Sequence, residues 1–201
     1  MSREIIAILR GVRPDECEDI TEALIAAGIT RIEVPLNSPG PLDSISRMRA
    51  LAGNRAMIGA GTVLTPQDVA ELARIGAQFV VSPDCNADVI RATKVAGMLS
   101  YPGVFTASEC FSALRAGADG LKFFPAGQLG PKGLSALRAV LPPDVPTYAV
   151  GGVGPQDFAD WFAAGVAGFG IGSALYQPGL SAAEVGERAQ MMVAAYDAAA
   201  G

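Results

Sequence analysis

Two charged residues stand alone in apolar runs, and together they offer an amine and a carboxylate. Lys122 lies within Gly120–Pro125, where every neighbour is apolar or glycine, and Glu33 lies in a similar run, Arg31–Leu36. Such runs are typical of strands buried on both faces, where burial lowers the basicity of a lysine. A deprotonated lysine is a nucleophile toward carbonyl compounds. The alternative is a lysine whose stem packs while its ammonium reaches solvent. We favour the nucleophile because Glu33 occupies a matching run.

Short apolar runs recur along the whole chain and predict strands. Their ends follow one another at intervals of 21 or 26 residues, which is the length of a strand, a helix and two loops. The runs are 5–9, 31–36, 57–61, 79–82, 99–103, 120–124, 147–150 and 168–171.

The segments between these runs carry the signals of helix ends. Thr65, followed by Pro66, and Thr106, followed by Glu109, are N-terminal capping patterns, while Gly28 and Gly117 are typical of helix C-termini. Eight units of strand then helix predict a (β/α)8 barrel, formed by a single domain over residues 1–201. A doubly wound open sheet is the alternative.

The two isolated charges fall on equivalent positions of this barrel. Glu33 and Lys122 each stand two residues before the end of their strand, the second and the sixth. Those strands are opposite each other, so inward-pointing side chains would meet near the barrel axis, at the C-terminal end where such barrels place function. A structural ion pair is the alternative, although buried pairs usually add little stability.

Polar and glycine residues follow four other strands. Glycine-rich turns after the last two strands of a barrel, leading to helix N-termini, commonly bind phosphate. The candidates are Arg10 after the first strand, Thr62 after the third, Gly151 and Gly152 after the seventh, and Gly172 and Ser173 after the eighth.

Composition excludes several classes of function. The net charge is −5 with no basic tract, which argues against binding nucleic acid or anionic membranes. The chain has no histidine, which excludes Ser-His-Asp catalysis and histidine metal sites. Its three cysteines, Cys17, Cys85 and Cys110, are widely spaced and indicate a reducing compartment. No apolar run is long enough to span a bilayer, so we expect a cytoplasmic protein.

Six ordered motifs resemble the 2-keto-3-deoxy-6-phosphogluconate and 6-phosphogalactonate aldolases. The resemblance covers essentially the whole chain and implies a (β/α)8 barrel, usually a homotrimer, that needs neither metal nor cofactor. The motifs are Ala7–Gly11, Ile32–Leu36, Gly59–Leu64, Tyr101–Gly103, Leu121–Ala126 and Ala149–Val153.

The resemblance also implies a role for each candidate residue. Lys122 would form a Schiff base with a phosphorylated keto-deoxy sugar acid, and Glu33 would carry the protons. The products would be pyruvate and glyceraldehyde 3-phosphate. Arg10 and Thr62 would hold the pyruvyl carboxylate, whereas the backbone of Gly151, Gly152 and Gly172, with Ser173, would bind the phosphate.

Two positions favour the 6-phosphogalactonate branch of this family. The gluconate enzymes carry an arginine three or four residues after the strand 2 glutamate, but Glu33 is followed by Val34-Pro35-Leu36-Asn37-Ser38. They also tend to carry threonine before the paired glycines, where Val150 stands here. The gluconate epimer as main substrate remains the alternative.

Two other functions fit the same barrel. A phosphosugar isomerase or epimerase would use Glu33 as base and Lys122 as an electrostatic stabiliser. A non-catalytic phosphosugar-binding barrel would keep the lysine and glutamate as a structural pair. The sequence leaves open the roles of three further loop residues, Asp84, Phe105 and Gln128.

Overall fold

Nine parallel strands form one sheet in the computed structural model, which describes residues 3–201. The strands are β1 (Ile5–Ile8), β2 (Arg31–Pro35), β3 (Met57–Gly61), β4 (Phe79–Val81), β5 (Leu99–Tyr101), β6 (Gly103–Val104), β7 (Leu121–Phe123), β8 (Thr147–Val150) and β9 (Gly168–Ile171).

The sheet closes on itself through a strand that is divided in two. The strand order is β5-β4-β3-β2-β1-β9-β8-β7-β6, and only Pro102 separates β5 from β6. Residues of β5 pair with β4, whereas Gly103 pairs with Lys122 of β7, whose N–H also donates to the carbonyl of Pro102 at 3.0 Å. The two halves therefore act as one barrel strand. This confirms the (β/α)8 barrel and its eight apolar runs, and rules out the open sheet.

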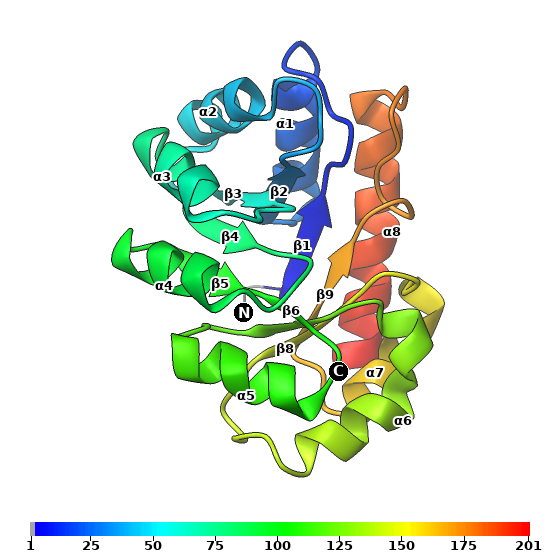
Figure 1. The fold of residues 1–201 in the computed structure, drawn as a ribbon. Helices are drawn as coiled ribbons and strands as arrows, with labels where there is room; N and C mark the ends of the chain where they lie inside the picture. Colours follow the sequence, from blue (N-terminus) through cyan, green and yellow to red (C-terminus); the bar gives the residue numbers. More distant parts are fainter. Residues whose placement is uncertain (1–2) are drawn as a thin grey trace.

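The helices form a ring around the strands (Figure 1). They are α1 (Cys17–Ala27), α2 (Pro41–Ala52), α3 (Pro66–Arg74), α4 (Ala87–Val95), α5 (Ala107–Ala116), α6 (Ala126–Arg138), the 3-10 helix η1 (Pro155–Asp157), α7 (Phe158–Ala163) and α8 (Ala182–Ala200). The last of these, drawn in orange and red, packs against α1 and α7 and so completes the ring.

Local sequence signals explain where several helices begin and end. The hydroxyls of Thr65 and Thr106 accept the backbone N–H groups of Asp68 and Glu109, and both carboxylates bond back to the N-cap N–H. Gly28 and Gly117 end α1 and α5 with φ of 93° and 101°, values that glycine adopts without steric cost. These predicted ends are confirmed.

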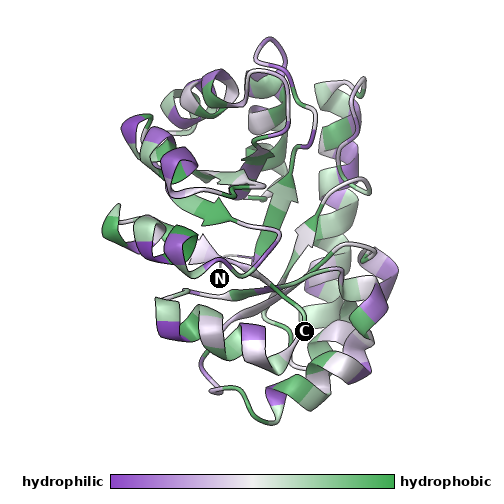
Figure 2. Cartoon of the chain, viewed as in Figure 1, coloured by the Kyte–Doolittle hydropathy of each residue, from purple (hydrophilic) through white to green (hydrophobic). Residues whose placement is uncertain are grey.

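The apolar core has two separate layers. Alternate strand residues point outward and pack under the helices, while the others fill the barrel interior. Figure 2 shows the result, with apolar strands and helices that carry their hydrophilic residues on the outside. The interior cluster consists of Ile6, Ile8, Phe79, Val81, Tyr101, Tyr148 and Val150.

A polar network closes the N-terminal end of the barrel. The Tyr148 hydroxyl donates to Glu4 Oε2 at 2.7 Å, and Arg31 Nη1 donates to both Tyr148 and Glu4. Burial and the bond to Glu4 raise the pKa of Tyr148 far above its ordinary value. These side chains therefore fill the N-terminal mouth of the barrel.

Among residues 3–201, none of the helices combines the length and the apolar character that crossing a membrane requires.

An aromatic cluster joins α7 and α8 to the barrel and offers a test of the outer core. Phe169 is fully buried, stacks on Phe158 with ring centroids 4.1 Å apart, and meets Phe162 edge-on. We expect Phe169→Ala to lower the free energy of unfolding by about 3–5 kcal/mol, because it leaves a cavity. Val95→Ala, at a side chain that is 90% exposed, is the control. Denaturant unfolding should show that its free energy of unfolding differs from that of the wild type by about 0.5 kcal/mol or less. An equal effect at both positions would contradict this packing.

Candidate active site

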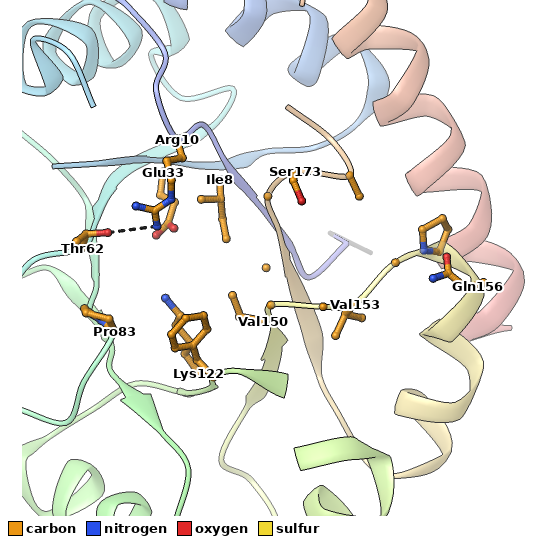
Figure 3. A pocket seen from close by; sticks show the side chains of 18 residues that line it. Ile8, Arg10, Glu33, Thr62, Pro83, Lys122, Val150, Val153, Gln156 and Ser173 are labelled. Carbon is orange, nitrogen blue, oxygen red and sulfur yellow. Dashed lines mark hydrogen bonds between the residues drawn. The ribbon is translucent and has the colours of Figure 1, made fainter. Parts of the chain in front are cut away.

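A cavity of about 380 Å³ opens at the C-terminal ends of the strands (Figure 3). It contains every site residue predicted from the sequence. The lining residues are Ile8, Arg10, Glu33, Thr62, Pro83, Lys122, Phe124, Val150, Gly151, Gly152, Val153, Gly154, Pro155, Gln156, Gly170, Gly172, Ser173 and Ala174.

Lys122 and Glu33 enter this cavity from opposite sides of the barrel (Figure 3). Lys122 is central in β7 and Glu33 is central in β2, and their side chains are only 7% and 2% exposed. Both also reach the top of the apolar interior cluster, so that hydrocarbon lies beneath each charge. The alternative of a lysine that extends to the surface is therefore wrong.

Burial shifts the proton affinity of both groups toward the neutral form. It lowers the pKa of Lys122, an effect that the Glu33 carboxylate opposes and the Arg10 charge reinforces. Burial also raises the pKa of Glu33 to about 7, against the pull of Lys122 and Arg10. The pair therefore combines an amine that gives up its proton readily with a carboxylate that can exchange one near neutral pH.

The two groups do not meet, which corrects the prediction of a contact at the barrel axis. Among the described residues, no ion pair joins Lys122 to Glu33, and Glu33 Oε2 is buried without a hydrogen-bond partner. The ammonium nitrogen of Lys122 lies 5.0 Å from the centre of the Phe124 ring instead. Since an unpaired buried carboxylate is costly, the space between the two groups suits a ligand that satisfies both.

A glycine on the neighbouring strand makes room for the Glu33 carboxylate. A Cβ atom added at Gly61 of β3 would lie 2.8 Å from Glu33 Oε1. No real Cβ fits at that distance, so any other residue at position 61 would push the carboxylate away. Gly61 of the Gly59–Leu64 motif is thus required for the position of the Glu33 carboxylate.

Arg10 presents its charge at one end of the cavity. Its Nη1 atom donates to Asn37 Oδ1 at 2.7 Å and its Nη2 atom to Thr62 Oγ1 at 3.5 Å. Thr62 has a φ of 55°, a left-handed conformation that is unusual for a β-branched residue and costs about 1–3 kcal/mol. Among the described residues, no carboxylate forms an ion pair with Arg10, so its charge is available to an anion.

Two glycine-containing turns line the other end of the cavity. Gly151 and Gly152 follow β8 with φ of 88° and 75°, and Gly172 and Ser173 follow β9. Within the described chain, the N–H groups of Gly152, Gly172 and Ser173 have no hydrogen-bond acceptor. Unpaired donors in a concave turn form a typical anion site.

The structure adds residues that the sequence did not single out and leaves others outside the cavity. Ile8, Pro83, Phe124 and Gln156 line it, and Asn37 contacts Arg10 from outside. Phe124 could have been found, because it stands two residues after Lys122 and so faces the same way. The three residues with open roles, Asp84, Phe105 and Gln128, do not line the cavity.

In the part of the chain that the structure describes, no three His, Cys, Asp or Glu side chains lie together in a way that could hold a metal ion.

The raised pKa of Glu33 predicts a pH-dependent cost in stability. Its folded value of about 7 exceeds that of an unfolded glutamate, about 4.3, so the stability of the wild type falls as pH rises through this interval. Glu33→Gln removes the carboxyl group and with it this dependence of stability on pH. We therefore expect the free energy of unfolding of the variant, relative to that of the wild type, to rise by about 1–3 kcal/mol between pH 5 and pH 8.

Denaturant unfolding at both pH values measures this difference. Glu71→Gln, at an exposed position of α3, is the matched control and should stay within about 0.5 kcal/mol of the wild type. A Glu33→Gln protein that is less stable than the wild type at pH 8 would contradict the burial of a costly carboxylate.

Comparisons with known proteins identify relatives along the whole chain. A protein of Rhizobium meliloti (strain 1021) named "Probable 2-dehydro-3-deoxy-6-phosphogalactonate aldolase" is 52% identical over 201 residues, covering 100% of this chain and 95% of the relative. The "2-dehydro-3-deoxy-6-phosphogalactonate aldolase" of Escherichia coli (strain K12) is 47% identical over 192 residues, covering 96% and 94%.

A solved structure and a family model give the same result. The structure described as "Native KDPGal structure" superimposes with a TM-score of 0.98 at 46% identity, covering 100% of this chain and 97% of that one. The family model "KDPG and KHG aldolase" matches residues 1–195. The chain therefore belongs to the KDPG and KHG aldolase family.

Proposed function

We propose that this protein is a class I aldolase that cleaves 2-dehydro-3-deoxy-6-phosphogalactonate into pyruvate and D-glyceraldehyde 3-phosphate. The observation that carries the proposal is the buried Lys122 amine, which faces the Glu33 carboxylate across the cavity without pairing with it. Membership in an aldolase family and the names of the two relatives support the same reaction.

The reaction begins with Lys122. Its neutral amine adds to the C2 ketone of the substrate, and loss of water leaves an iminium ion. A free lysine, with a pKa of about 10.4, would be almost fully protonated at neutral pH. The lowered pKa of Lys122 makes the nucleophilic form accessible.

The carbon–carbon bond breaks in the second stage. A base removes the proton of the C4 hydroxyl, and the electron pair of the C3–C4 bond moves into the iminium, which becomes an enamine. Glyceraldehyde 3-phosphate leaves as the aldehyde formed at C4. Without the iminium as electron sink, the electron pair would have no stable place to go.

Proton return and hydrolysis complete the cycle. Glu33, acting through water, supplies a proton to C3 of the enamine and regenerates the iminium. Water then adds to the iminium carbon, and pyruvate leaves as the Lys122 amine is restored. A carboxyl group with a pKa of about 7 suits both the uptake and the release of a proton at neutral pH.

The two ends of the cavity bind the two anionic groups of the substrate. Arg10 and Thr62 hold the pyruvyl carboxylate, where the guanidinium offers parallel donors. The N–H groups around Gly151, Gly152 and Gly172, with Ser173, bind the phosphate. These roles rest on the position of each residue around the cavity and on the free donors described above.

The choice of epimer rests on Val150 and on the absence of an arginine in the residues that follow Glu33. Its side chain is 6% exposed, lines the cavity beside Gly151 and packs against Gly170 of β9, where an added Cβ would lie 2.7 Å from Val150 Cγ2. An apolar side chain at this place cannot donate to the C4 hydroxyl, the group whose configuration separates the two epimers. We therefore assign the galactonate epimer as the main substrate.

The homotrimer, the cytoplasmic location and the single domain over residues 1–201 stay predictions, based on the family resemblance and the sequence.

Trapping with pyruvate and borohydride tests the covalent mechanism. We expect mass spectrometry to find one adduct of reduced pyruvate, located to Lys122 and absent from Lys122→Ala, which should also lose activity. Lys132→Ala, a change of the same type in α6, should be labelled like the wild type. An unlabelled wild type would exclude the Schiff base and favour the isomerase or the binding protein.

Substitution of Val150 tests the choice of epimer. We expect Val150→Thr to raise kcat/KM for the gluconate epimer about tenfold relative to the galactonate epimer, because the new hydroxyl can bond to the C4 hydroxyl. Val150→Ala is the control: it removes the same apolar contact without adding a hydroxyl, so both activities should fall together. A wild type with much the higher kcat/KM for the gluconate epimer would overturn the assignment.

A further inference from the structure

Asn37 contacts the substrate-binding arginine without lining the cavity itself. Its Oδ1 atom accepts a hydrogen bond of 2.7 Å from Arg10 Nη1, whereas the other bond to this guanidinium, from Thr62, is 3.5 Å long. Asn37 is absent from the residues around the cavity. The shorter bond of Arg10 therefore comes from a residue that does not line the cavity.

The segment around Asn37 is held rigidly. Leu36 N–H donates to the Gly61 carbonyl at 2.8 Å, and Ser38 N–H donates to the Pro35 carbonyl at 2.9 Å. The Ser38 hydroxyl, which is nearly buried, accepts the N–H of Gly11 at 2.9 Å and so joins the loop after β2 to the loop after β1. Asn37 therefore contacts Arg10 from a backbone segment that hydrogen bonds hold in place.

A fixed acceptor matters because the arginine is exposed. A free arginine side chain loses up to about 2 kcal/mol of rotamer entropy when it is immobilised. The bond to Asn37 orders the guanidinium before a ligand arrives and leaves three of its five N–H donors for that ligand once Thr62 is counted.

It also matters that the acceptor, the Asn37 amide, is uncharged. A carboxylate at position 37 would also accept from Nη1, but it would cancel the charge of Arg10 and compete with an anionic ligand. The amide orients the guanidinium and leaves its charge uncompensated, as the lack of any ion pair to Arg10 among the described residues indicates.

We propose that Asn37 is a positioning residue that fixes Arg10 for the pyruvyl carboxylate and sets the affinity of the enzyme for pyruvate. This inference rests on the proposed function, because it takes Arg10 as the carboxylate ligand. Asn37 acts only through Arg10, so its effect disappears when the guanidinium is removed.

The test measures the pyruvate concentration that gives half-maximal trapping of Lys122 by borohydride. Asn37→Ala raises this concentration about tenfold, the size expected for losing one hydrogen bond to a charged group, while kcat stays within about twofold. Asn37→Asp raises it at least as much, although the carboxylate can still accept the bond. Asn54→Ala and Asn54→Asp, at the N-terminal end of the barrel, are matched controls and bind pyruvate like the wild type.

A double-mutant cycle separates this role from a structural one. In an Arg10→Ala background, adding Asn37→Ala produces no further change in half-saturation. Inhibition by inorganic phosphate, which reports on the other end of the cavity, is the same in Asn37→Ala and the wild type, and this shows that the site is intact.

The outcomes distinguish a failure of the role of Asn37 from a failure of the proposed aldolase function. Normal pyruvate binding by Asn37→Ala, normal binding by Asn37→Asp, or an equal loss in the presence and absence of Arg10 overturns the inference. If pyruvate and borohydride do not label even the wild type, the proposed function itself fails.

Discussion

The site depends on two opposite charges that are buried in one barrel and kept apart. If Lys122 and Glu33 formed an ion pair, each would stabilise the charged form of the other, and the shifts in pKa that burial produces would be reduced. Their separation leaves an amine that loses its proton easily and a carboxyl group that gains one easily. The same separation leaves the space that a substrate carbon would occupy between them.

The barrel maintains this arrangement by being closed at one end and open at the other. The Glu4, Arg31 and Tyr148 network and the apolar interior cluster close the N-terminal end and exclude water beneath the charges. The open end carries Arg10 and the unpaired backbone donors. The chain as a whole bears a net charge of −5, so these local groups must attract an anionic ligand against the overall field.

Binding capacity is obtained here at a cost in folding stability. Glu33 Oε2 is buried without a partner, and Thr62 holds a left-handed conformation. Each feature destabilises the folded protein in the absence of a ligand. The packing of the core must compensate for it, including the Phe158, Phe169 and Tyr196 cluster in the layer between strands and helices. The strained and unsatisfied groups lie around the cavity, where a substrate can relieve them.

The sequence by itself determined the barrel and most of the candidate site. Strand spacing, capping residues and C-terminal glycines are local signals. The parallel strands of a barrel bring their C-terminal ends to one face, so Lys122, Glu33, Arg10 and the glycine turns could be placed together in advance. Only the tertiary structure decided the gap between Lys122 and Glu33, the Phe124 ring beside the ammonium, and the bond from Arg10 to Asn37. Distances across a barrel depend on its tilt and on the rotamers of side chains from different strands, and no periodicity along the chain encodes these.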